Sequence, residues 1–192
     1  LQEGFASTVS AGGTAFGTDH VQLLCDLGVH HVYIAFDRDS SGDQAALKVG
    51  QEFQKRGVEV SVVRLSHGCD PDTVLRERGP LGMQEYIEKA PNFIVFAFNT
   101  LKEKTDISTP AGKNQVVQAL IKYIEQWDHP LMVHEAYKKI AQEIDVPESV
   151  LPRAKKPSQP AISTSAGMKN SVIAHDRFVE MDLLRLLLLT ED

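Results

Sequence analysis

The chain has 192 residues, of which 42% are hydrophobic and 24% charged, an ordinary balance for a globular protein. Its net charge of -6 gives no support to a basic groove for nucleic acid, although an acidic metal site can handle phosphates through its metal. The two cysteines form no C-x-x-C pair, which argues against a disulfide framework or a cysteine zinc site and fits a reducing, cytoplasmic setting. No apolar run has the length of a membrane span, so no membrane partner is expected.

Strand and helix patterns alternate over the first 91 residues. Residues 1–5 have the pattern of a helix end, and Gly28 is placed to close the helix over 19–27. The pattern predicts strands at 6–11, 31–36 and 58–65, and helices at 19–27, 43–56 and 73–78. Alternation with short loops predicts an α/β fold with a parallel sheet flanked by helices.

Pairs of aspartates follow two of these strands. Asp37 and Asp39 end the apolar run at 31–36, and Asp70 and Asp72 come shortly after the next strand. Parallel strands end at the same edge of a sheet, which is where open α/β sheets bind their ligands. Residues two apart in extended backbone also face the same side. The four carboxylates could therefore surround one cavity and hold one or two Mg²⁺ ions.

Helix capping is the alternative interpretation of these acids. Asp70 before Pro71 has the pattern of an N-cap followed by proline in the first turn, and spacing alone favours this over metal binding. For Asp37 and Asp39 metal binding is favoured, because a turn after the apolar run would need only one such residue. Residues 40–42, Ser-Ser-Gly, could hold a phosphate or form an ordinary N-cap, and the pattern does not separate the two.

Only helices are predicted after about residue 92. The first helix covers 93–104, the second begins at the cap Ser108-Thr109-Pro110, and the third covers 131–144. Three helices joined by short loops predict a small bundle. Residues 151–170 are rich in Pro, Ser, Thr and Lys and predict a flexible linker. An amphipathic helix expected at 176–189 would begin a further domain within residues 171–192.

The motifs resemble those of a known family. Asp37-Arg38-Asp39-Ser40-Ser41-Gly42 and Asp70-Pro71-Asp72 resemble the D-x-D and D-P-D motifs of the Toprim fold. Gly13-Thr14-Ala15, followed by Asp19-His20-Val21-Gln22-Leu23-Leu24, resembles an L-G-T-x-x-T-x-x-H-x-x-L-L segment. The order and spacing of these blocks are similar to those of bacterial DnaG-type DNA primases.

This resemblance implies a division of the chain into four parts. Residues 1–91 would be the C-terminal part of a Toprim catalytic domain, and residues 92–150 the helical subdomain of the catalytic core. Residues 151–170 would be the linker, and residues 171–192 the start of a helicase-binding domain.

The resemblance also implies an activity, the synthesis of short RNA primers for DNA replication by metal-dependent nucleotidyl transfer. Asp37 and Asp39 would be catalytic and would hold Mg²⁺, for which Mn²⁺ could substitute, and Asp70 and Asp72 would complete the metal site. The expected partners are a single-stranded DNA template, ribonucleoside triphosphates and a replicative helicase bound through the C-terminal region. The expected location is the cytoplasmic replication fork.

The chain departs from the family pattern in several places. The Toprim signature opens with a glutamate in E-G-x-x-D, but Glu3-Gly4 is followed by Ser7 rather than aspartate. The true glutamate is therefore expected before Leu1, as is the zinc-binding domain of the family, and this piece alone is expected to be inactive. Arg38 also stands where the family commonly has glycine.

Other functions remain open. Another Toprim enzyme, a topoisomerase or a nuclease, would need partner domains or a nucleophilic tyrosine, and no tyrosine here has such a context. The chain could also be a non-catalytic module that docks a helicase. An intact Toprim glutamate upstream would argue against that alternative. A phosphatase of the haloacid dehalogenase type also uses D-x-D, but it needs Thr or Val where Ser41 stands.

Overall fold

The computed structural model describes residues 5, 7–10, 16–66, 68–152 and 184–187. Four parallel strands form one sheet in the order β1-β4-β2-β3. They are β1 (Thr8–Val9), β2 (His31–Ala35), β3 (Glu59–Val63) and β4 (Leu184–Leu187). The parallel sheet flanked by helices confirms the fold class predicted from the sequence.

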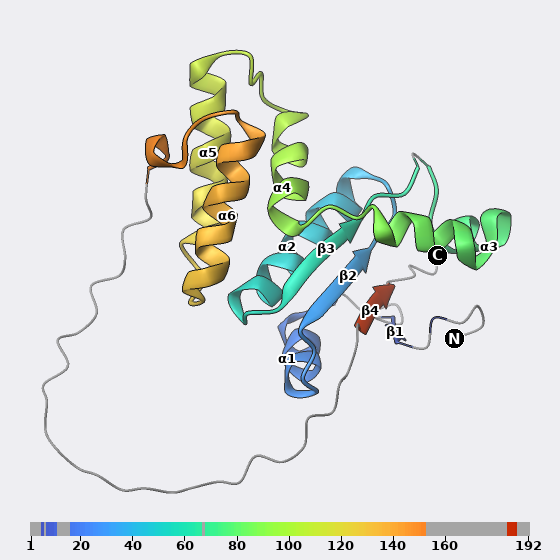
Figure 1. Ribbon diagram of the computed structural model, residues 1–192. Coiled ribbons are helices and arrows are strands. Elements are labelled where there is room, and N and C mark those ends of the chain that lie inside the picture. The colour runs from blue at the N-terminus through green and yellow to red at the C-terminus, as the bar shows by residue number, and fades with distance from the viewer. Residues whose placement is uncertain (1–4, 6, 11–15, 67, 153–183, 188–192) are drawn as a thin grey trace, which may run out of the picture.

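In the described part of the chain, six helices accompany the sheet (Figure 1). They are α1 (Thr18–Asp26), α2 (Ser40–Lys55), α3 (Pro71–Glu88), α4 (Phe93–Lys102), α5 (Pro110–Ile124) and α6 (Pro130–Glu143), and a short 3₁₀ turn, η1 (Glu148–Val150), follows α6. Helices α4, α5 and α6 form the predicted bundle, and α3 lies apart from it (Figure 1). No helix in the described ranges is long and apolar enough to cross a bilayer.

The predicted helix over 176–189 is wrong at residues 184–187, which form strand β4. This strand lies between β1 and β2 and pairs with both, with Arg185 opposite Thr8 on one side and Tyr33 on the other. A short leucine-rich run is too short for its periodicity to separate a strand from a helix. Its pairing with two neighbouring strands makes it a strand here.

Helix α3 continues well beyond the predicted end at residue 78. Gly79 has a φ of 65° and interrupts the helix, and Pro80 follows it. A positive φ is accessible to glycine without steric cost, which lets the chain kink here and resume as helix up to Glu88. Gly79-Pro80 therefore marks a kink inside one element and not its end.

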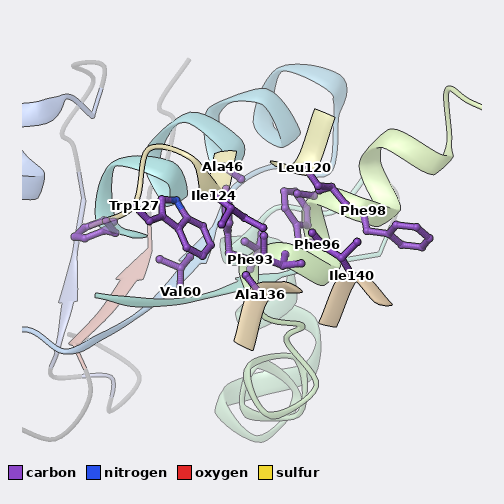
Figure 2. Packing of buried hydrophobic residues seen from close by; sticks show 14 of the residues in the cluster. Ala46, Val60, Phe93, Phe96, Phe98, Leu120, Ile124, Trp127, Ala136 and Ile140 are labelled. Carbon is purple, nitrogen blue, oxygen red and sulfur yellow. The ribbon is translucent and has the colours of Figure 1, made fainter. Parts of the chain in front are cut away.

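One hydrophobic core runs from the sheet into the bundle (Figure 2). Phe93, the first residue of α4, is buried with Val60 of β3 and with Trp127, which follows α5. Gly50 of α2 lets the Phe93 ring approach closely, because a Cβ atom at position 50 would lie 2.6 Å from that ring. The core thus crosses the boundary predicted between residues 91 and 92, where α4 is anchored directly to the sheet.

The segment that leads into the bundle lies along the outer side of β3. The Val62 amide donates a hydrogen bond to the Pro91 carbonyl over 2.9 Å, and Ser61 forms an isolated antiparallel bridge with Asn92. Asn92 then caps α4, since its side-chain oxygen accepts a bond from the Val95 amide at 3.0 Å. The start of the bundle is therefore positioned by backbone hydrogen bonds to the sheet.

Candidate functional site

The loop after β2 carries the first pair of predicted site residues. Asp37 is partly buried, and its carbonyl oxygen accepts a hydrogen bond from the Asp39 amide at 2.9 Å. A Cβ atom at position 42 would overlap that same carbonyl oxygen, so only glycine allows α2 to begin this close to the loop. The sequence therefore forms a compact turn that keeps Asp37 and Asp39 on one short loop.

Asp39 is the N-cap of α2, so the helix begins at Ser40 and not at the predicted Asp43. Its Oδ1 atom accepts hydrogen bonds from the Gly42 amide at 2.7 Å and the Ser41 hydroxyl at 2.8 Å. These bonds, first the one from the amide and then the one from the hydroxyl, hold the pKa of the Asp39 carboxyl below its usual range. Both of these bonds end on Oδ1.

Asp70 is the N-cap of α3, and the capping interpretation of this residue is confirmed. Its carboxylate accepts a hydrogen bond from the Thr73 amide at 2.5 Å, and Pro71 is the first helical residue. The bond from the Thr73 amide, followed by the one from the Thr73 hydroxyl, lowers the pKa of the Asp70 carboxyl. Asp72 is exposed and forms an ion pair with Arg76 one turn along the helix.

The two aspartate pairs lie at the same edge of the sheet. Strands β2 and β3 are parallel neighbours with Ala35 opposite Val63, and α2 and α3 both begin beyond the carboxyl ends of these strands (Figure 1). Within the described ranges, no three His, Cys, Asp or Glu side chains are close enough to hold a metal ion. The four acids therefore share an edge without forming a closed cluster, and their role as metal ligands stays a prediction.

The chemistry of the donors fits a hard divalent cation. Asp37 and Asp39 supply only carboxylate oxygens, and Mg²⁺ in proteins commonly has one or two carboxylate ligands and retains several waters. Two carboxylates on one short loop thus fit Mg²⁺ or Mn²⁺ better than a metal that prefers sulfur or nitrogen.

The sequence did not predict a charged cluster that lies near this loop. Arg64, which directly follows β3, places its Nη2 atom 2.9 Å from Oε1 of Glu103 and 3.8 Å from Oδ2 of Asp43. The Nη2 atom of Arg38, which lies between Asp37 and Asp39, is 3.9 Å from the same Glu103 oxygen. No sequence signal could have found these pairs, because Glu103 lies 39 residues beyond Arg64.

Comparison with known families gives two matches along the chain. Residues 1–75 match a family described as Toprim-like, and residues 94–149 match the DnaB-helicase binding domain of primase. The parallel sheet with acids at its carboxyl edge is thus a Toprim-type fold.

Related proteins and structures agree with this class. The DNA primase of Chlamydia pneumoniae is 34% identical over 98% of this chain and 32% of its own length. A DNA primase domain from Pseudomonas aeruginosa has the same fold, with a TM-score of 0.66 and 22% identity over 78% of this chain and 48% of that one. A DnaG primase catalytic domain bound to single-stranded DNA gives a TM-score of 0.60 and 26% identity over 71% of this chain and 44% of that one.

The chain belongs to the bacterial DnaG-type DNA primase family. It spans about a third of the length of the curated relatives that it matches.

The helicase-binding match falls on the bundle of α4, α5 and α6. The sequence instead predicted that residues 171–192 begin the helicase-binding domain. Of these, 171–183 and 188–192 lie outside the described part of the chain, and so does most of the predicted linker. The four-part division of the chain therefore stays a prediction.

Proposed function

We propose that this chain is part of a DNA primase and contributes Asp37 and Asp39 to the site that synthesises RNA primers on a single-stranded DNA template. The observation that carries the proposal is the similarity to DNA primases over nearly the whole chain. The location of this aspartate pair at the carboxyl edge of a parallel sheet supports it, because such edges bind ligands in open α/β folds.

The loop after β2 would act by holding carboxylates in place. Asp39 is fixed by its bonds to Gly42 and Ser41, and the same bonds lower its pKa because they favour the ionised carboxylate. A Mg²⁺ ion bound there would activate the attacking 3′-hydroxyl and neutralise charge on the transferring phosphoryl group, and Mn²⁺ could substitute. Asp70 and Asp72 would shape the same edge of the site.

The proposed partners come from the relatives. A related catalytic domain has been determined with single-stranded DNA, and residues 94–149 match a helicase-binding family. We therefore propose a single-stranded template, ribonucleoside triphosphates and a replicative helicase as partners, at a cytoplasmic replication fork. One structure similar to this chain includes a zinc-binding domain, and we expect zinc only in such a domain.

A chimera tests the activity. The chain replaces the matching segment of the Chlamydia pneumoniae primase, and primer synthesis is measured on single-stranded DNA with ribonucleoside triphosphates. Asp39→Asn keeps an N-cap acceptor but removes the charge, so we expect a loss of about 100-fold or more. The control Asp128→Asn, at an exposed position between α5 and α6, retains full synthesis. Full synthesis by Asp39→Asn would contradict the proposal.

Metal binding can be tested on this chain directly. We expect Mn²⁺ to bind the wild type more tightly than Asp37→Ala in a titration followed by the electron paramagnetic resonance signal of free Mn²⁺. Equal binding would remove the metal-site assignment. Primer synthesis by the 192 residues alone would contradict the expectation that this piece is inactive by itself.

A further inference from the structure

A pocket of about 280 Å³ lies where the bundle meets the sheet, slightly smaller than the cavities that hold drug-sized ligands. It lies beside His31 and Glu59, the first residues of β2 and β3, which are paired across the sheet. The aspartate loops follow the other ends of these strands, so the pocket is separate from the candidate metal site. Its apolar lining includes Val60, Phe93 and Trp127, which Figure 2 shows close together.

Gln54 of α2 lines this pocket with an amide that is buried but not bonded. The residue is 6% exposed, and its side chain has no hydrogen-bond partner among the described residues. Gln51, one turn earlier and equally buried, is the contrast, because its amide donates to the Tyr123 carbonyl at 2.9 Å and its oxygen accepts the Trp127 indole N–H at 3.1 Å. A buried polar group without a partner costs free energy, so native proteins rarely keep one. Gln54 therefore marks the pocket as a place where a ligand bonds.

The lining of the pocket carries more negative than positive charge. Glu59 and Glu135 are exposed carboxylates, and Lys139 is the lysine that faces them in the lining. The Ser61 hydroxyl lies 3.0 Å from Nε2 of His31, and burial lowers the pKa of His31, although Glu59 acts in the opposite direction. A lowered pKa favours the uncharged imidazole, so His31 adds little positive charge. This balance favours a neutral ligand over an anion.

A primary amide pairs best with a ligand that presents a donor beside an acceptor. The Gln54 oxygen can accept a hydrogen bond from an amino group while its N–H donates to a neighbouring ring nitrogen, which is how glutamine pairs with adenine. Apolar walls suit the faces of such a ring.

We propose that the pocket binds a neutral heterocyclic base of the adenine type, with Gln54 recognising the edge that carries the amino group. This site is a second one, and it does not depend on the proposed primer synthesis.

The fluorescence of Trp127 tests the proposal on the whole chain, because Trp127 is the only tryptophan in the sequence and lines the pocket. We expect adenine to change this fluorescence saturably, and purine, which lacks the amino group, to bind about 10-fold more weakly. Gln54→Leu should weaken adenine binding by about 10-fold or more, since both bonds are lost. The same substitution should raise the urea midpoint, because it removes a buried amide that has no partner, so the variant stays folded.

Gln118→Leu is a matched control, because Gln118 is an exposed glutamine of α5 outside the lining of the pocket. This variant should bind adenine as the wild type does. A pocket that holds only water would give no saturable change with adenine, and that result would overturn the proposal. Equal adenine binding by Gln54→Leu and Gln118→Leu would overturn it as well, and tighter binding of adenosine monophosphate than of adenine would contradict a neutral ligand.

Discussion

Asp39 and Asp70 each combine a helix cap with a place at the candidate site. Each carboxylate accepts an amide hydrogen bond from the first turn of a helix, and in each this bond is the main cause of a lowered pKa. A cap fixes the direction of the side chain and favours its ionised form, and both properties suit a ligand for a cation. Capping and metal binding are therefore compatible at these residues.

Two substitutions at Asp70 separate these roles. Asp70→Ala removes the acceptor for the Thr73 amide, and we expect the free energy of unfolding to fall by about 1 kcal/mol. Asp70→Asn keeps an acceptor and should stay within about 0.5 kcal/mol of the wild type. Urea denaturation measures both values. An equal loss in both variants would show that the charge, and not the cap, stabilises α3.

The aspartates that end the strands could be predicted from the sequence, whereas the partners of Arg64 could not. An apolar run followed by Asp37 is a local pattern, and so is Asp70 before proline. The pairing of Arg64 with Glu103 depends on how α4 packs beside β3, and no local pattern encodes that packing. For the same reason the sequence could not show that Arg38 lies near Glu103.

The close packing of α4 on α2 depends on glycine at position 50 of α2. A Cβ atom at Gly50 would lie 2.6 Å from the Phe93 ring. Gly50→Ala gains about 1 kcal/mol of helix propensity but forces the ring to move, which commonly costs about 1–3 kcal/mol. We expect a net loss of up to about 2 kcal/mol in the free energy of unfolding, measured by chemical denaturation.

The double variant Gly50→Ala/Phe93→Leu tests the cause of this loss. A smaller side chain at position 93 relieves the overlap, so the two substitutions together should cost about 1 kcal/mol less than the sum of their separate effects. Strict additivity would show that the ring is not the obstacle.

Helix boundaries and strand β4 show where prediction from sequence reached its limit. The sequence predicted a cap within Ser108-Thr109-Pro110, and the structure shows that Thr109 is the N-cap, with its hydroxyl oxygen accepting a bond of 3.1 Å from the Gly112 amide. The end of α3 was misplaced because a glycine-proline pair normally terminates a helix, and here it only kinks one. Strand β4 was predicted as helix because leucine favours helices, whereas its pairing with the distant strands β1 and β2 makes it a strand.

The common core leads to a prediction about the folding of the chain. Trp127 is the only tryptophan in the sequence, and its indole N–H donates a hydrogen bond to Gln51 of α2 at 3.1 Å. Trp127 therefore reports the contact between the bundle and α2, whereas far-UV circular dichroism follows all the helices.

We expect the fluorescence and dichroism transitions in urea to coincide, because one core joins the two parts. A fluorescence transition at lower urea concentration would show that the bundle separates before the sheet unfolds. Gln51→Leu, which removes the indole hydrogen bond, should shift both transitions together.

Pro91 and Asn92 also cover the outer edge of strand β3. Exposed strand edges are templates on which other chains pair and aggregate. The β3 edge is covered by this segment, and Pro91 has no amide N–H with which to extend the ladder. At the opposite edge, β1 comprises two residues, and very short edge strands are poor templates. Within the described sheet, both edges are thus poor templates for a strand of another copy.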